Sequence, residues 1–452
     1  LYFSRYKNSN ANTDQFFECF EETSGKNLEQ FKKCWLYRIG YPKVSFKTFY
    51  DSQAMTYKIQ FCQKQSNALE VPFHIPIELA AIDNAGNVIN GTNLVFEFKS
   101  TNSELVFENI LTEPAFVSVN RNYSFYGTCL RENEEQDSLI LQIRLDDNLF
   151  NRIEAFRRLT DIQRIRLLNW IDAKIDDSWI DLFGELLCDR NIAPSTKAFF
   201  IRIDEQPLDR NYSSWILELV DVHEKLMRTI NKTYKSELVE EFESLDTYKK
   251  KSSPKDNIEE RILKQTLLEL IVIDDTPDSH DLIRSHYARS TSATDKIGAL
   301  VAMNRSSMIE RTRVLEKIYR DWVGHISAYS NYLRIISSGW NNDVFEMIKN
   351  ERERPSFDIT NPTWARALFL TMAGNTKKIW TKEGILWATQ VIIDLASLNT
   401  YVASKLLNVF QDYKRMRPNV KSMTGDALKA IIEEIPEKIN PTINRQALSY
   451  FE

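Results

Sequence analysis

Residues 27–50 constrain the fold most, because within this stretch the spacing of apolar residues changes from a helical to a strand pattern. Leu28, Phe31 and Trp35 follow at i, i+3 and i+7, which places them on one face of a helix. The next apolar residues alternate with polar ones, which is the period of a strand. These alternating residues are Val44, Phe46 and Thr48. We therefore expect a helix that leads into a β domain, and a helix face that chain preceding this sequence would cover.

Polar and turn-forming residues bound this helix. Asn27 is a good N-cap, because its side chain can accept a hydrogen bond from an unpaired backbone amide. Gly40 and Pro42 favour the end of the helix, since proline cannot continue it. An earlier helix is predicted to begin at Thr13 and to end near Gly25. The first 40 residues thus predict two helices.

Alternating patterns recur up to about Tyr126, and they predict six or seven short strands. The apolar members are Tyr57, Ile59 and Phe61; Phe73, Ile75 and Ile77; Leu94, Phe96 and Phe98; Leu105 and Phe107; and Val117 and Val119. Residues 83–86 form a predicted turn that ends in a glycine. This number of strands and their spacing indicate a small antiparallel β-sandwich, immunoglobulin-like in architecture.

From about Asp137 onward the helical period holds to the end of the chain. One predicted stripe comprises Ile258, Ile262, Leu263, Leu267 and Leu270, and another comprises Met308, Thr312, Leu315, Tyr319 and Trp322. Short polar or proline-containing links separate the helices. The fold class is therefore mostly α with a small all-β domain: an immunoglobulin-like sandwich followed by a helical array of stacked pairs. The lysine-rich residues 248–253 are predicted to be a flexible loop.

Composition excludes several classes of partner. The formal net charge of −5 gives no basic footprint for a nucleic acid. No apolar run approaches the roughly 18 residues that a membrane span requires, so we expect no membrane segment. The five cysteines are scattered without a C-x-x-C pair, which favours reduced thiols in a cytoplasmic protein.

Sequence motifs for catalysis are missing from this chain. None of the five histidines belongs to H-E-x-x-H, which places two zinc ligands on one helix face. His280 and His286 are six residues apart and would make a poor chelate. The sequence also lacks a G-x-S-x-G elbow and a P-loop. We therefore predict no catalytic residue and no metal ligand within this chain.

Five blocks of residues, taken in order, carry a family resemblance. The blocks are Leu1-Tyr2-Phe3 with Arg5, Phe31, Trp35, Gly40 and Pro42; Pro72-Phe73-His74-Ile75-Pro76-Ile77 with the turn Asp83-Asn84-Ala85-Gly86; Asp147-Asn148-Leu149-Phe150-Asn151-Arg152-Ile153-Glu154-Ala155; Asn361-Pro362 with Arg366; and Asn399 with Val402-Ala403-Ser404-Lys405. Together they resemble the C-terminal part of bacterial-type aminopeptidase N, a zinc metallopeptidase of the gluzincin class. Two departures are Ile153, where the family usually has tryptophan, and residues 123–127, which differ from the segment that usually closes the sandwich.

The resemblance implies three domains and a function. Residues 1–40 would be the terminal helices of the thermolysin-like catalytic domain, 41–130 the sandwich and 131–452 the C-terminal helical array. The whole enzyme would be a cytoplasmic alanyl aminopeptidase that removes N-terminal residues from peptides with a zinc-bound water. Its N-terminal and catalytic domains would be the missing partners of this chain. The helical array would cap the active site and restrict substrate entry.

The resemblance also implies two substrate-binding residues, Arg366 and Lys405, at positions where the family places arginines that point towards the catalytic cavity. An alternative function stays open, since a sandwich plus a helical array also suits a free-standing interaction scaffold without enzymatic activity. A reading frame that extends several hundred codons upstream and encodes H-E-x-x-H would favour the enzyme. A start codon at or just before Leu1 would favour the scaffold.

Overall fold

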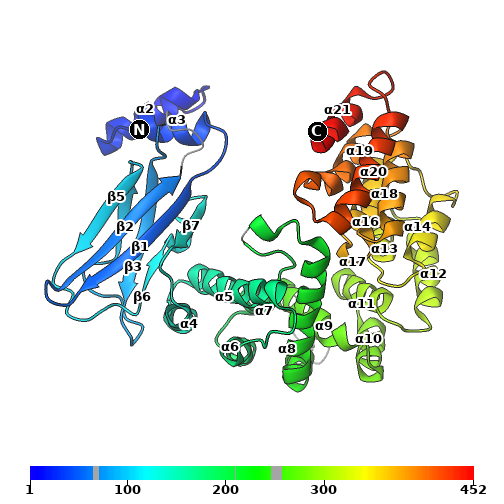
Figure 1. Cartoon of the computed structure of the whole chain (residues 1–452), viewed down its shortest axis with the longest axis horizontal. Coiled ribbons are helices and arrows are strands. Elements are labelled where there is room, and N and C mark those ends of the chain that lie inside the picture. The colour runs from blue at the N-terminus through cyan, green and yellow to red at the C-terminus, as the bar shows by residue number, and fades with distance from the viewer. Residues whose placement is uncertain (65–70, 209, 246–256) are drawn as a thin grey trace. The chain divides into compact units, whose positions relative to one another are not determined.

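The computed structural model describes residues 1–64, 71–208, 210–245 and 257–452. The predicted loop at residues 248–253 lies outside the described residues. The chain divides into two compact units, Leu1–Leu159 and Thr160–Glu452. Figure 1 shows a sheet-containing first unit and an all-helical second unit. This arrangement confirms the predicted fold class.

In its described residues, the first unit contains five α-helices and seven strands. They are α1 (Tyr2–Tyr6), α2 (Thr13–Ser24), α3 (Glu29–Leu36), β1 (Lys43–Asp51), β2 (Thr56–Lys64), β3 (Ile75–Ile82), β4 (Leu94–Phe98), β5 (Asn102–Phe107), β6 (Phe116–Val119), β7 (Thr128–Arg131), α4 (Gln136–Leu145) and α5 (Leu149–Asn169), the last of which contains the unit boundary. Where two N-terminal helices were predicted, the structure has three. The helix expected at Leu28 begins at Glu29, whose backbone N–H donates to Asn27 Oδ1 over 3.1 Å.

The strands form two sheets that pack face to face. One sheet has the order β5-β2-β1-β7 and the other has the order β4-β3-β6. Aromatic rings fill the space between them, with Phe61 stacked on Phe96 at 5.3 Å and tilted against Phe98 at 5.8 Å. The predicted antiparallel pattern is wrong at one edge, because β1 pairs with β7 in parallel. Strand alternation reports which face is buried but not strand direction, so the sequence could not show this pairing.

The block of residues 147–155 has a structural role that the sequence pattern did not show. Arg121 is buried beside β6, and its guanidinium lies 2.6 Å from Asp147. Asn151 Nδ2 donates to Ser118 Oγ over 2.7 Å and to the carbonyl of Val119 over 3.1 Å. These contacts tie the start of α5 to the sandwich.

The second unit is a helical array, drawn from green to red in Figure 1. Its helices are α6 (Asp177–Cys188), α7 (Pro194–Ile201), α8 (Ile216–Ser244), α9 (Ile258–Ile271), α10 (Pro277–Arg289), α11 (Ala293–Arg305), α12 (Arg311–Trp322), α13 (Ile326–Ser337), α14 (Val344–Arg352), α15 (Pro362–Ala365), η5 (Arg366–Leu370), α16 (Thr371–Ala373), α17 (Thr376–Ile379), α18 (Lys382–Leu395), α19 (Thr400–Leu407), α20 (Pro418–Glu434) and α21 (Pro441–Phe451). Consecutive helices pack in pairs, such as α8 with α9, α10 with α11, α12 with α13 and α20 with α21. The predicted array of stacked pairs is thus confirmed.

The predicted apolar stripes hold only in part. In α9 the last three residues of the stripe, Leu263, Leu267 and Leu270, are buried, whereas Ile258 and Ile262 are exposed. The first turns of α9 therefore carry apolar residues without a buried face, which periodicity alone cannot detect.

Buried asparagines join helices of the array. Asn231 donates from Nδ2 to the carbonyls of Leu270 and Ile271, each over 2.9 Å, at the end of α9. Asn304 makes a similar bond to the end of α13. Since the last carbonyls of a helix have no partner within it, these amides supply the missing hydrogen bonds.

Candidate functional site

The two predicted substrate-binding residues both lie near one aromatic side chain. The guanidinium carbon of Arg366 is 6.0 Å from the centre of the Tyr401 ring. Lys405 Nζ is 5.8 Å from the same centre. All three side chains are exposed. Residues 35 or more positions apart in the sequence are thus brought together, and we name Arg366, Tyr401 and Lys405 the cationic cluster.

Local sequence determines the position of Arg366. Asn361 caps α15, and its Oδ1 accepts hydrogen bonds from the backbone N–H groups of Thr363 and Trp364 at 3.0 and 3.4 Å. Pro362 follows at the first helical position, where its missing N–H costs nothing. Arg366 then opens η5, a π-helical segment. Such widened turns occur frequently at functional sites.

The second half of the cationic cluster comes from α19. Asn399 caps this helix, because its Oδ1 accepts from the backbone N–H of Val402 over 3.2 Å. Tyr401 and Lys405 are four residues apart and therefore lie on the same helix face. Tyr401 was not among the residues predicted from the sequence. The signal that could have found it is this spacing, since an aromatic residue at i and a lysine at i+4 can contact each other.

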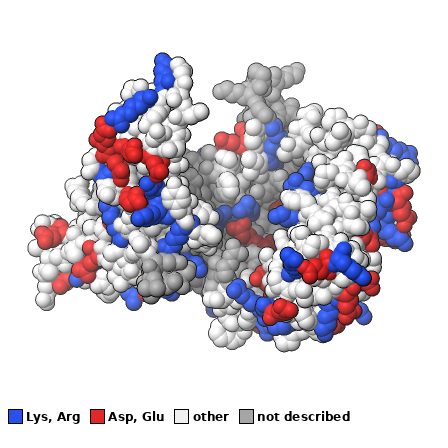
Figure 2. All heavy atoms as spheres, turned by 90° about the horizontal axis from the view of Figure 1, so that it is seen from above, with Lys and Arg blue, Asp and Glu red and all other residues white. Residues whose placement is uncertain are grey.

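The charge of the cationic cluster is not neutralised locally. Within the described parts of the chain, no carboxylate lies within ion-pair distance of Arg366 or Lys405. On the face drawn in Figure 2, by contrast, basic and acidic side chains are interspersed. Two cations that share one ring can attract an anion. Arginine can grip a carboxylate through two parallel hydrogen bonds, whereas lysine supplies a point charge.

The histidines do not gather into a metal site. His74 is buried before β3, His286 lies edge-on to Phe242 at 5.1 Å, and His280 contacts Asp275 at 2.7 Å. In the described residues, no three His, Cys, Asp or Glu side chains are close enough together to hold a metal ion. Zinc in proteins needs three or four such ligands around one point. The described residues of this chain therefore do not fit a zinc centre.

The neighbouring carboxylates Asp274 and Asp275 lie in hydrogen bonds and ion pairs. Asp274 accepts hydrogen bonds from Lys235 Nζ and from Ser279 Oγ, each over 2.5 Å. These partners hold the pKa of Asp274 below its usual value, against the effect of burial. Asp275 lies 3.0 Å from the backbone N–H of Ser307. These contacts stabilise the start of α10 and its neighbouring loop. They explain the presence of the two carboxylates by a structural role, so no catalytic role is needed.

Two family models match consecutive parts of the chain. Residues 40–132 match a domain of unknown function described as having an Ig-like fold. Residues 136–439 match a domain of unknown function described as ARM repeats. The class of protein that the fold defines is thus an Ig-like domain followed by ARM-like helical repeats.

Curated relatives agree with these family models. The chain is 22% identical to "Aminopeptidase N" of Escherichia coli (strain K12) over 98% of its own length and 53% of the relative. It is 23% identical to "Aminopeptidase N" of Caulobacter vibrioides, covering 99% of this chain and 52% of the relative. The chain spans about half the length of these relatives. It belongs to the family formed by the Ig-like and ARM-repeat domains of aminopeptidase N, and the resemblance predicted from the sequence blocks is confirmed.

A solved structure agrees with the fold. The crystal structure of Legionella pneumophila aminopeptidase A in complex with aspartic acid superimposes with a TM-score of 0.83 at 19% identity. The match covers 99% of this chain and 53% of that chain. In the described part of the chain, no helix is long and apolar enough to cross a membrane.

Proposed function

We propose that this chain is the non-catalytic C-terminal part of a cytoplasmic zinc aminopeptidase that removes N-terminal residues from peptides. The similarity to aminopeptidase N along nearly the whole chain supports this proposal. The relatives' additional length corresponds to the N-terminal and catalytic domains that we propose as partners. Zinc would be held by residues outside this chain, since the described residues here do not fit a zinc centre.

The helical array would cap the active site of the whole enzyme and restrict entry to the ends of peptides. The observation that carries this proposal is the cationic cluster, in which Arg366 and Lys405 share Tyr401 and have no carboxylate partner among the described residues. A peptide held by its N-terminus extends its carbonyls, and finally its carboxylate, away from the catalytic centre. Arg366 would bind that carboxylate through two parallel hydrogen bonds. Lys405 would add a positive charge whose hydrogen bonds have no fixed direction.

The test uses the full-length enzyme with Arg366→Met. Tri- and tetrapeptides reach the proposed contact and aminoacyl amides do not, so KM should rise for the peptides alone. Loss of a desolvated charge-assisted hydrogen bond costs roughly 1.5 to 3 kcal/mol, which corresponds to about tenfold or more in KM.

A matched control is Arg320→Met, because Arg320 is also exposed but lies in α12 beside Glu316. The control should leave both classes of substrate unchanged. Equal effects of Arg366→Met on peptides and amides would overturn the proposal, and so would no effect on either. A full-length protein without aminopeptidase activity would instead favour the interaction scaffold.

A further inference from the structure

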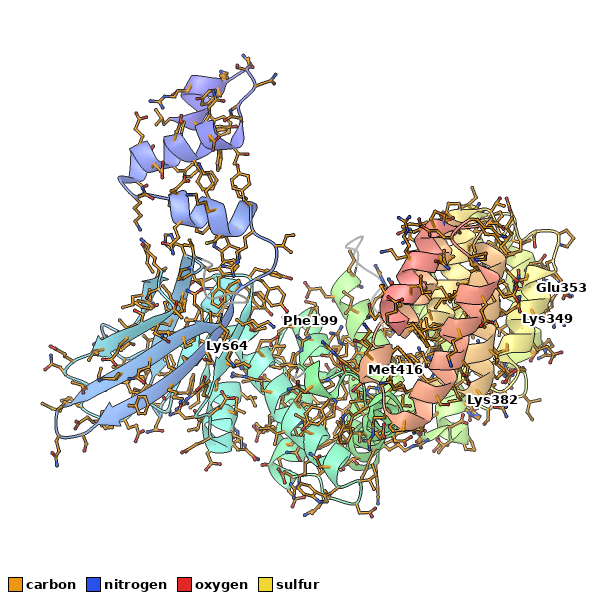
Figure 3. The ribbon with its side chains drawn as sticks, turned by 45° about the horizontal axis from the view of Figure 1, so that its top comes forward. Lys64, Phe199, Lys349, Glu353, Lys382 and Met416 are labelled. Carbon is orange, nitrogen blue, oxygen red and sulfur yellow. The ribbon has the colours of Figure 1, made fainter. Side chains whose placement is uncertain are left out.

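A cavity of about 690 Å³ lies within the second unit and shares no residue with the cationic cluster. Its walls come from the chain after α7, from α8, α9, α11 and α17, and from residues 408–416. Met416, labelled in Figure 3, is one of the lining residues. A space of this size can hold a small molecule or one long side chain.

One hydrogen-bond acceptor in the cavity wall is held in place without a partner. The Asn375 side chain is buried, and its Nδ2 donates to the carbonyls of Ser337 and Gly339 over 3.2 and 2.8 Å. These two bonds fix the amide, and Oδ1 is left without a hydrogen-bond partner. A buried acceptor without a donor costs free energy, which a ligand that donates a hydrogen bond would recover.

His223 contributes a second acceptor of this kind. Its Nδ1 is buried and has no hydrogen-bond partner, while the ring bonds to the backbone of Asp204. Burial lowers the pKa of His223 to about 4, with Arg164 and Lys377 acting in the same direction. The imidazole is therefore neutral at pH 7, and donation to Asp204 through Nε2 leaves Nδ1 as an acceptor.

Two carboxylates in the same wall lack a cation. Within the described residues, no lysine, arginine or histidine lies within ion-pair distance of Glu205 or Asp412. Burial raises the pKa of the Glu205 carboxyl, while the more distant charge of Arg305 and a hydrogen bond with the side chain of Thr376 act in the opposite direction. A cationic group placed beside Glu205 would favour its ionised form.

The cations of the cavity wall are already engaged. Lys377 Nζ lies 2.6 Å from Glu224, and an Arg305 guanidinium nitrogen lies 3.5 Å from Glu269. Both cations also approach the ring of Trp340, at 4.0 Å for Lys377 and 4.9 Å for Arg305. The groups of the cavity wall that lack a hydrogen-bond or ion-pair partner are therefore acceptors and negative charges. They belong to Asn375, His223, Glu205 and Asp412.

We propose that this cavity is a binding site for an aliphatic primary ammonium group. A primary ammonium carries three N–H donors and one positive charge, which suits a cavity lined by unpartnered acceptors and by two carboxylates without an ion-pair partner. The apolar part of the wall, which includes Leu219 and Met227, suits the methylene stem of such a ligand. The same chemistry occurs in free diamines and in the side chains of basic peptides.

Isothermal titration calorimetry on the 452-residue chain tests the proposal with three probes. Cadaverine represents a free diamine, and acetyl-Gly-Lys-Gly-amide represents a basic side chain whose ammonium is the peptide's only charge. Diacetylated cadaverine is the neutral control. We expect saturable binding of at least one charged probe and none of the neutral one. Binding of cadaverine alone would assign the site to free amines, and binding of the peptide alone would assign it to basic side chains.

Two variants and a matched control locate the binding. Glu205→Gln and Asp412→Asn remove one charge each. Each should weaken the binding of the charged probe about tenfold, as expected for loss of a charge-assisted hydrogen bond. Glu433→Gln removes an exposed charge from α20 outside the cavity and should leave binding unchanged. Circular dichroism identifies any variant that does not fold. If one of the two cavity variants does not fold, the affinity of the other variant tests the proposal. The proposal is overturned if neither charged probe binds, if the neutral probe binds equally, or if the folded cavity variants bind as the control does.

Discussion

Asn304 Nδ2 donates a hydrogen bond of 2.8 Å to the carbonyl oxygen of Ile335, near the end of a different helix. The Asn304 side chain is fully buried, and its Oδ1 accepts from Arg311 over 3.0 Å. Each atom of this amide therefore has a partner. Asn231, Asn375 and Asn440 make similar bonds elsewhere in the array, so the helices are joined by amides as well as by apolar packing.

Replacing Asn304 should destabilise the array. Asn304→Ala removes one donor to the carbonyl of Ile335, which keeps Ser338 as a donor, and it removes the side-chain oxygen that accepts from Arg311. We therefore expect the free energy of unfolding to fall by about 1 to 3 kcal/mol. Asn331→Ala is the matched control, because Asn331 lies near the surface of α13, where it accepts only from Arg334. The control should change stability by less than about 0.5 kcal/mol. Urea denaturation followed by circular dichroism measures both, and equal losses would contradict the proposed role of the buried amide.

Much of the fold could be predicted because period and burial are local properties. The change of period near Val44 follows from neighbouring residues, and the structure confirms it with a strand from Lys43 to Asp51. The parallel pairing of β1 with β7 depends on chain direction across the sandwich, which no local pattern contains. The buried asparagines were missed for the same reason, because an asparagine that bonds a distant helix looks in sequence like any polar residue.

The candidate site was predictable only through the family resemblance. A lone exposed arginine or lysine on a helix is usually just solvated, so Arg366 and Lys405 carry no signal of their own. Their proximity depends on the packing of η5 against α19, which brings both to Tyr401. The cavity was not predicted at all, because its unmatched acceptors are ordinary residues until the fold removes their partners.

His223 should make stability depend on pH. Its pKa is about 4 in the folded chain, chiefly because of burial, against 6.5 for an unperturbed histidine. Between these values the unfolded chain binds a proton that the folded chain does not, so stability falls as pH decreases from 6.5 to 4 and is fully present above 6.5. The loss is on the order of 3 kcal/mol. Denaturation of the wild type and of His223→Gln at several pH values should show a gap that closes as the pH falls, and a constant gap would contradict this assignment.

The N-terminal helices should exchange hydrogen fastest. Phe3 is 82% exposed and Phe20 is 49% exposed, so α1 and α2 bury little apolar surface. In contrast, α3 is tied to the sandwich, because Trp35 Nε1 donates to the carbonyl of His74 over 2.9 Å. Hydrogen exchange measured by mass spectrometry should be fast at residues 1–26, which indicates fraying, and slower in α3. Alternatively, the exposed apolar residues of this region should make the chain self-associate. Protection of residues 1–26 equal to that of the helical array, in a monodisperse monomer, would be inconsistent with this expectation.

The chain alone should bind no zinc stoichiometrically and hydrolyse no aminoacyl substrate. The reason is the missing ligand set, since neither H-E-x-x-H in the sequence nor a cluster of three ligands among the described residues is available. Metal analysis after dialysis measures the first quantity, and a fluorogenic alanine amide measures the second. About one tightly held zinc ion per chain would refute the prediction.

Changes at Lys405 and Tyr401 should alter peptide affinity in opposite directions. In the full-length enzyme, Lys405→Arg replaces a point charge with a planar group that can grip a carboxylate twice, so KM for tri- and tetrapeptides should fall by about three- to tenfold. Tyr401→Leu removes the ring that both cations approach at about 6 Å. Contacts of this kind at exposed sites contribute about 0.5 to 1 kcal/mol, so KM should rise about two- to fivefold.

Lys429→Arg is the matched control for Lys405→Arg. Lys429 is also exposed on a helix and lies 5.8 Å from an aromatic ring, that of Phe451, but it is outside the cationic cluster. The Lys429→Arg substitution should leave KM unchanged for every substrate, because no peptide carboxylate is proposed to reach Lys429. Steady-state kinetics with a tetrapeptide and with an aminoacyl amide separates the two classes of substrate. If Lys405→Arg behaves as Lys429→Arg does, or shifts KM for the amide as much as for the tetrapeptide, then Lys405 does not contact the far end of the peptide.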